Sequence, residues 1–309
     1  MIDFIKNRKY TYIFSAILLF VSWGSLILFG LKPGMDFIGG SVLELKLNSN
    51  QIDQNFIEET YKEYGYQNVS IALNGDDNLT IRSVDVNEEN HQQIIQKIKE
   101  KYNNVEEMRF ESFGPVIGKE LRDKSIKAII LVLIGIIIYL SWAFRQVLKP
   151  MASWRYGVTA ILALIHDVSI PTGLYALFGH LNGLEIDSNF VVAILVILGF
   201  SVHDTIVVFD RIREKLKTHP TLDFKGVINE SINETIRRSV FTSLTLLFVL
   251  LALLIFGPPS LFYFTLTLIV GTFFGTYSSI FIVSPLLYDW YLFLQKNKNK
   301  QGKNLKGKK

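Results

Sequence analysis

The sequence contains no cysteine among its 309 residues, and only 19% of them are charged. Without cysteine the chain forms no disulfide, performs no thiolate chemistry and gives no clue to its redox compartment. Hydrophobic residues make up 49% and gather into runs long enough to cross a bilayer. The sequence therefore predicts an integral membrane protein. Its net charge of +4 becomes informative only when it is divided between the two sides of the membrane.

Six apolar runs have the length of a transmembrane helix: residues 11–30, 126–144, 154–178, 190–209, 239–256 and 261–288. The first run is long, no small-x-small cleavage site closes it, and Leu31-Lys32-Pro33-Gly34 follows, so we interpret it as an uncleaved anchor rather than a signal peptide. Six spans return both ends to one side. Lys/Arg residues predict that this side is cytoplasmic: Arg145, Lys149 and Arg155 in one loop, residues 211–225 in the next, and seven lysines after Gln295. These charges are also expected to contact anionic membrane lipid.

Residues 32–125 form a polar insertion between the first two runs. From Lys32 to Asp123, 10 Lys/Arg stand against 17 Asp/Glu. Residues 42–47, 68–73, 78–84 and 105–110 have the pattern of strands, and Asp53 and Asn87 stand at N-cap positions of two helical stretches. Residues 74–77, Asn-Gly-Asp-Asp, predict a turn. The order β-α-β-β-α-β indicates a ferredoxin-like domain.

The predicted fold is thus mainly α-helical, with six transmembrane helices and one extracytoplasmic ferredoxin-like α+β domain between the first two. We divide the chain into a cytoplasmic N-terminus with the first helix (residues 1–31), the outer domain (32–125), the five remaining helices (126–291) and a basic cytoplasmic tail (292–309).

The fourth run contains an acid, Asp204, within GFSVHDTIVVFDRIRE (residues 199–214). A charge at the centre of a span costs roughly 2.5 to 3.5 kcal/mol on insertion scales, so an intramembrane acid is a candidate functional residue. Asp204 lies roughly 9 Å of helix inside Asp210, in the inner half of the membrane. His203 beside it either relays protons or fills a packing gap. We assign Asp210 to an interfacial charge cluster, with a pairing role as the alternative.

The third run contains Asp167, roughly 20 Å of helix from Trp154 and therefore near mid-membrane. Pro171 cannot donate the hydrogen bond that the Asp167 carbonyl would normally accept, so a polar backbone group is freed at the same depth. One interpretation is a hydrated cavity with Asp167 on a proton route. The other is a helix kink with a protonated Asp167 bonded to a neighbouring helix. His166 is either a relay or a packing residue.

Two arginines at the start of the fifth run compete as counter-ion of Asp204. Arg238 continues at helical spacing into Thr242 and Thr245, whereas Arg237 continues into apolar residues. We expect Arg238 to face the interior and Arg237 to reach the headgroups. Movement of Arg238 would then switch Asp204 between protonated and ionised forms, as a proton-driven machine requires. A static salt bridge between the fourth and fifth helices is the alternative.

The sixth run carries Gly271, Gly275 and Ser279 at four-residue intervals. Such small residues let another helix approach closely. We interpret them as packing positions, with a subunit interface as the alternative.

Four stretches resemble the SecF family of bacterial protein-export membrane proteins, in the resistance-nodulation-division superfamily. They are GMDFIGGS (residues 34–41), FGPVIGKEL (113–121), IHD (165–167), and GFSVHDTIVVFDRIRE together with NETIRRSVFTS (233–243). The resemblance implies a non-enzymatic, proton-coupled export subunit of the bacterial cytoplasmic (inner) membrane. It implies SecD, the SecYEG channel, YajC and the translocating polypeptide as partners, with no cofactor, metal or nucleic acid.

Carried over by motif, the family's fourth-span acid falls on Asp204 and its fifth-span arginine on Arg238, with Thr242 one turn further on. His203 stands where relatives usually have asparagine. Asp36, Gly39 and Gly40 match the family's signature outside the first span, where the glycines permit a tight turn into the first strand.

Two other functions stay open. Two acids on adjacent spans suit an intramembrane aspartic protease, but Arg238 favours an ionised Asp204, and no Gly-x-Gly-Asp or Pro-Ala-Leu signature occurs. A small-molecule efflux subunit of the same superfamily is the other, disfavoured by the small outer domain. The coupling ion is also open, because a carboxylate with hydroxyl neighbours suits sodium as well as a proton.

Overall fold

The protein was analysed as a computed structural model, which describes residues 2–47, 52–67, 69–74, 78–102, 105–145, 150–219 and 221–306. Several predicted features lie outside these residues: the turn residues 75–77, the strand residue Asn68, the loop residue Lys149 and the last two lysines. The chain divides into two compact units. The sheet unit comprises Pro33–Ala128 and Glu185–Ser188, and the helical unit comprises Met1–Lys32, Ile129–Leu184 and Asn189–Lys309.

The sheet unit contains one four-stranded antiparallel sheet in the order β2-β3-β1-β4. Its strands are β1 (Gly40–Leu47), β2 (Ser70–Asn74), β3 (Asn78–Ser83) and β4 (Val105–Phe113), and its helices are α2 (Met35–Ile38), α3 (Gln54–Glu63) and α4 (Glu88–Lys101). This is the strand order of a ferredoxin-like βαββαβ fold, as predicted. Both predicted caps are present: Asp53 accepts the Phe56 amide at 3.2 Å, and Asn87 accepts the Asn90 amide at 2.8 Å.

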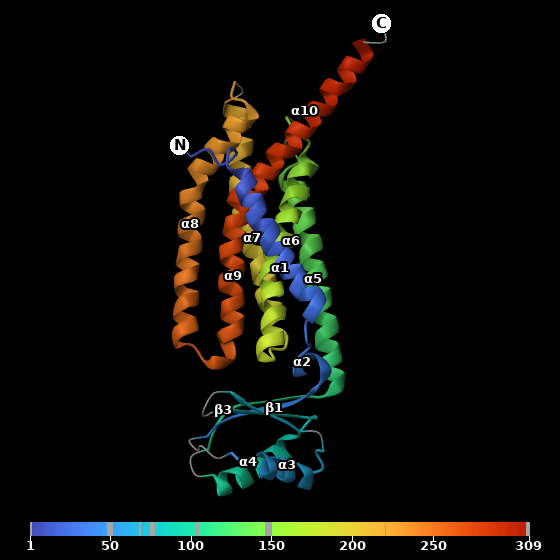
Figure 1. Ribbon diagram of the computed structural model, residues 1–309, viewed down its shortest axis with the longest axis vertical. Helices are drawn as coiled ribbons and strands as arrows, with labels where there is room; N and C mark the ends of the chain where they lie inside the picture. The colour runs from blue at the N-terminus through green and yellow to red at the C-terminus, as the bar shows by residue number, and fades with distance from the viewer. Residues whose placement is uncertain are drawn as a thin grey trace. The chain divides into compact units, whose positions relative to one another are not determined.

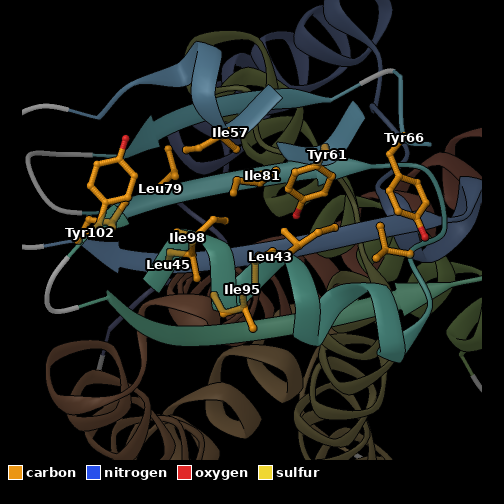
Figure 2. Close-up of a cluster of buried hydrophobic side chains, with 13 residues drawn as sticks. Leu43, Leu45, Ile57, Tyr61, Tyr66, Leu79, Ile81, Ile95, Ile98 and Tyr102 are labelled. Atoms are coloured by element: carbon orange, nitrogen blue, oxygen red, sulfur yellow. The ribbon is translucent and has the colours of Figure 1, made fainter. Parts of the chain in front are cut away.

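The core of the sheet unit lies between one face of the sheet and two helices. Every second residue of β1 points to this face, so Leu43, Leu45 and Leu47 are buried while Lys46 is exposed. Figure 2 shows Leu43 and Leu45 of β1, with Leu79 and Ile81 of β3, facing Ile57 of α3 and Ile98 of α4. Alternate side chains of β1 and one face each of α3 and α4 therefore pack together in a single apolar layer.

The described residues contain six helices that are long and apolar enough to cross a membrane. Most residues of these helices belong to the helical unit. The helices are α1 (Arg8–Phe29), α5 (Pro115–Ala143), α6 (Ser153–Asn182), α7 (Ser188–Thr218), α8 (Phe224–Phe256) and a composite sixth. The sixth comprises the short turn η1 (Pro259–Leu261), α9 (Phe262–Ser278), the π-helical turn η2 (Ser279–Val283) and α10 (Ser284–Lys306). Figure 1 shows α8 and α9 side by side. The chain is a multi-pass membrane protein.

Helix α5 begins well before the predicted second span. It starts at Pro115 and runs without interruption to Ala143. Proline is favoured in the first turn of a helix, where its missing amide is not needed, and no further proline separates it from the apolar run. The polar residues after Pro115 are therefore the first turns of a transmembrane helix.

The N-terminal segment, residues 2–8, packs against the ends of α8 and α10. Asp3 Oδ2 accepts from Lys225 Nζ at 2.7 Å, and Asp3 Oδ1 accepts from Asn229 Nδ2 at 2.9 Å. Arg8 Nε donates to both carboxylate oxygens of Asp289, at 2.9 and 3.0 Å. Ile5 is fully buried beneath these contacts. We call residues 2–8 with these partners the N-terminal clasp.

Candidate functional site

Three spans form the buried centre of the helical unit. About half of the residues in the most apolar stretches of α6, α7 and the sixth span are buried, whereas α1, α5 and α8 are mostly exposed. Gly271 and Gly275 allow α9 to lie close against α7. A Cβ on Gly271 would lie 2.2 Å from Ile197 Cδ1, and one on Gly275 would lie 3.3 Å from Ser201 Cβ. The predicted packing role of these two glycines is confirmed.

Asp167 lies at this centre and is completely buried. Its Oδ2 accepts from Ser201 Oγ of α7 at 2.5 Å and from Ser278 Oγ of α9 at 2.7 Å. Its Oδ1 lies 2.8 Å from His166 Nδ1. The carboxyl group is thus held by side chains from three positions on three spans, which satisfies the requirement that a buried polar group be hydrogen-bonded.

Asp204 is also buried, with 1% of its surface exposed. Its Oδ2 accepts from Thr276 Oγ1 at 3.0 Å. The Thr276 hydroxyl lies 2.5 Å from Ser243 Oγ of α8, so a hydroxyl pair connects Asp204 to the fifth span. One turn of α7 separates Asp204 from Ser201, the residue that binds Asp167.

A short segment of the sixth span supplies hydroxyls to both acids. Thr276 binds Asp204, Ser278 binds Asp167, and Ser279 lies 3.0 Å from Thr205 through the two hydroxyl oxygens. Thr276 and Ser278 are two residues apart, which turns their side chains about 200° from one another around the helix. They therefore reach different neighbours. The π-helical turn begins at Ser279, directly after them, and such turns are frequent at functional sites.

The structure corrects two expectations about neighbouring residues. Arg238 does not face the interior of this chain: Arg238, Thr242 and Thr245 are exposed, and the buried stripe of α8 contains Ser239 and Ser243 instead. The side chains of adjacent helical residues point about 100° apart around the helix axis. The buried stripe of α8 therefore lies one residue further along the chain than the predicted stripe, with Ser239 in place of Arg238.

The two histidines lie beside the two acids. His203 does not fill a packing gap, because its side chain is 58% exposed, with Nδ1 3.9 Å from Asp204 Oδ1. The ring of His166 bends back along α6 and bonds the neighbouring Asp167 carboxylate. Residues adjacent in a helix do not share a face, but an imidazole is long enough to bond the next side chain.

The remaining candidate residues lie around this centre or in the sheet unit. Asp210 is exposed and lies 3.7 Å from Arg213, within a charge cluster at the end of α7. In that cluster Lys215 of α7 pairs with Glu230 and Glu234 of α8, at 3.1 and 2.8 Å. In the sheet unit, Asp36 lies in α2, and Gly39 and Gly40 follow it with φ of +84° and +133°. Both glycines thus adopt backbone conformations that other residues rarely take, as predicted.

Sequence reasoning missed Thr276 and Ser278. Serine and threonine are common in transmembrane helices as packing residues, and the four-residue spacing of small residues drew attention to Gly271, Gly275 and Ser279 only. The sequence does contain a signal for these two residues: hydroxyl side chains are concentrated in GTYSS, residues 275–279, within an otherwise apolar run.

Comparison with known proteins decides the family. The family described as protein export membrane protein SecD/SecF, C-terminal, matches residues 93–292, and the SecD/SecF GG motif matches residues 24–50. The chain is 38% identical over 301 residues to protein translocase subunit SecF of Thermobaculum terrenum, covering 94% of both chains. It belongs to the SecF family of protein translocase subunits.

Other SecF relatives and a solved structure agree. The SecF subunit of Anaerolinea thermophila is 39% identical over 285 residues, covering 90% of this chain and 92% of the relative. The crystal structure of SecDF, a translocon-associated membrane protein from Thermus thermophilus, superposes with a TM-score of 0.78 at 31% identity. That comparison covers 94% of this chain and 38% of the SecDF chain. These SecF relatives are components of a transport machinery.

Proposed function

We propose that this SecF chain is a proton-motive-force-coupled accessory subunit of the Sec export machinery, which promotes translocation of polypeptides across the cytoplasmic membrane. The observation that carries the proposal is the pair of buried acids, Asp167 and Asp204, each bound by a hydroxyl from the same segment of the sixth span. Buried intramembrane acids in a polar network are a costly arrangement, and transport proteins use it to bind and release protons.

Hydroxyl partners suit an acid that changes its protonation state. An ionised carboxylate only accepts hydrogen bonds, whereas a protonated one must also donate. Thr276 can donate to an ionised Asp204 or accept from a protonated one and donate to Ser243 instead, since a hydroxyl does both. Protonation of Asp204 thereby reverses the direction of a hydrogen-bond chain that joins α7, α9 and α8.

Asp167 and His166 form the second part of the proposed route. His166 Nδ1 is bonded to Asp167, and its buried Nε2 has no hydrogen-bond partner among the described residues. A ring with one nitrogen bonded and the other open can accept a proton at one side and release it at the other. Each elementary charge crossing 100 mV supplies about 2.3 kcal/mol, so single protons drive modest rearrangements and translocation takes repeated cycles.

The exposed side of α8 supports assembly with a second membrane subunit. Arg238, Thr242 and Thr245 are exposed on a span, and His203 of α7 is exposed as well. Charged groups in contact with lipid are unfavourable, which favours cover by other protein or a water-filled space. SecD is the proposed partner, beside SecYEG and YajC, with the unfolded polypeptide as substrate. This chain covers 38% of the SecDF chain that it resembles.

We also propose that both termini lie in the cytoplasm of a bacterial cell, in the inner membrane, with the sheet unit outside. The distribution of Lys and Arg supports this orientation, because positive charge accumulates in cytoplasmic loops. Membrane lipid then contacts the basic C-terminal tail.

Export assays in inverted membrane vesicles that contain the full Sec complex test the proposal. Asp204→Asn should abolish the stimulation of export by a proton gradient while the complex still assembles. Glu58→Gln, which alters only an exposed acid 3.4 Å from Lys62 in the sheet unit, is the control and should retain stimulation. Normal stimulation in Asp204→Asn would refute the mechanism, and varying pH and sodium separately identifies the coupling ion.

A further inference from the structure

The three residues before α7 and the first residue of α7 belong structurally to the sheet unit. This segment, Glu185–Ser188, is hereafter the captured segment. Ile186 forms a parallel bridge with Pro33, and its carbonyl accepts the Gly34 amide at 2.8 Å. Glu185 Oε1 lies 3.2 Å from Arg82 of β3. The segment is therefore attached to the sheet unit at two of its residues, through backbone and side chain.

Asp36 attaches a third residue of this segment, at the point where α7 begins. The carboxylate is nearly buried, and its Oδ2 accepts from the Ser188 amide at 2.8 Å and from Ser188 Oγ at 2.5 Å. Ser188 is the first residue of α7. The first amides of a helix have no partner within the helix, and a negative charge there is favourable. Asp36 thus caps α7 from a position 152 residues earlier in the chain.

The glycines of the two outer motifs make the surroundings of Asp36 rigid. A Cβ on Gly39 would lie 2.7 Å from Pro115 Cα, and one on Gly118 would lie 2.7 Å from the Gly39 amide nitrogen. A Cβ on Gly34 would lie 2.8 Å from the Ile186 carbonyl oxygen. Backbone therefore packs directly on backbone here, and small side-chain adjustments cannot absorb a displacement.

A displacement at Ser188 reaches the buried acids through α7. Ser201 and Asp204 lie thirteen and sixteen residues further along this uninterrupted helix, about 20 to 24 Å from its start. A helix transmits an axial shift along its length because each turn is hydrogen-bonded to the next. The Ser201 to Asp167 hydrogen bond, at 2.5 Å, is broken by a shift of about 1 Å.

We infer that Asp36 is a positioning residue that ties the start of α7 to the sheet unit, so that motion of the sheet unit and the hydrogen bonding of Asp167 and Asp204 are coupled. The inference rests on the proposed proton-driven function and deepens it. It assigns to the acid of the GG-motif region a mechanical role at the captured segment. The same link works in reverse: proton binding at Asp204 shifts α7 and thereby moves the captured segment with the sheet unit.

Because the chain contains no cysteine, the hydrogen bonds between Asp36 and Ser188 can be replaced by an engineered disulfide without competition from other thiols. In gradient-driven export vesicles, Asp36→Ala and Asp36→Cys should lose most of the stimulation by the gradient, and Asp36→Asn should retain part of it because its amide oxygen still accepts from Ser188. The double variant Asp36→Cys/Ser188→Cys should regain stimulation when its disulfide is formed and lose it on reduction. Glu58→Ala, elsewhere in the sheet unit, should behave as wild type.

The outcomes separate this link from the proposed function. Asp204→Asn is measured in the same vesicles, and if it exports normally, the proposed function fails. If Asp204→Asn is defective but Asp36→Ala is normal, only the link fails. If the Asp36 variants are defective and the disulfide does not restore stimulation, Asp36 acts otherwise and the inference is overturned. Should Asp36→Ala not assemble, the comparison of oxidised and reduced double-cysteine protein decides alone.

Discussion

Replacing Ser278 with alanine should destabilise the protein, because Ser278 supplies one of the three side-chain contacts of a fully buried acid. Its Oγ donates to Asp167 Oδ2 at 2.7 Å, and no solvent can substitute since Asp167 has no exposed surface. A hydrogen bond to a neutral group contributes about 0.5 to 1.5 kcal/mol and one to a charged group about 1.5 to 3 kcal/mol. We expect Ser278→Ala to lower the free energy of unfolding by about 1 to 3 kcal/mol, measured by reversible unfolding in mixed micelles.

The chain offers a matched control on the neighbouring fifth span. Ser239 is 1% exposed, and its Oγ has no hydrogen-bond partner among the described residues. Ser239→Ala removes the same atom without a bond, so it should be neutral or stabilising. Ser278→Thr keeps the hydroxyl and should recover part of the loss. Equal stabilities of Ser278→Ala and Ser239→Ala would refute the assignment of Ser278 to Asp167.

Two further contacts yield predictions. The hydrogen bond from Lys225 lowers the pKa of Asp3 from 3.8 to about 2, so Asp3 stabilises the fold fully above pH 3.8 and loses this contribution as the pH falls towards 2. Because its side chain is 38% exposed, the effect is at most about 1 kcal/mol. Thermal midpoints of wild type and Asp3→Asn should differ at neutral pH and converge near pH 2; a persistent gap would contradict this. Gly173→Ala places a Cβ 2.4 Å from Ser22 Cα, backbone that cannot move aside, and should cost about 1 to 3 kcal/mol. Gly24→Ala meets nothing within 4 Å, so an equal loss there would show that helix packing is not the cause.

Local patterns were sufficient to predict the fold. Apolar run length identified the six spans, period-two alternation identified β1 and β3, and capping chemistry identified the starts of α3 and α4 at Asp53 and Asn87. Each signal depends on residues within a few positions of one another. The start of α5 at Pro115 was missed because its first turns are polar and carry no membrane signal.

The candidate site was only partly predictable, because its geometry depends on contacts distant in sequence. Asp204 and Asp167 stand out as acids in apolar runs, and hydropathy alone finds them. Thr276 is 72 residues from Asp204, and Ser278 is 111 from Asp167. Both are ordinary hydroxyls whose roles appear only when α9 lies against α7 and α6. The inward face of α8 was also not determined by its own sequence, since an arginine stripe can face a partner as well as the interior.

The N-terminal clasp has a consequence for synthesis of the chain. Residues 2–8 are synthesised long before their partners, because Asp3 and Arg8 bind residues that follow more than two hundred positions later. Arg8 pairs with Asp289 at a separation of 281. The clasp therefore closes only after the last span has been translated and inserted. A chain truncated before Asp289 leaves Arg8 without its carboxylate partner. Closure of the clasp thus requires the sixth span, which carries Asp289.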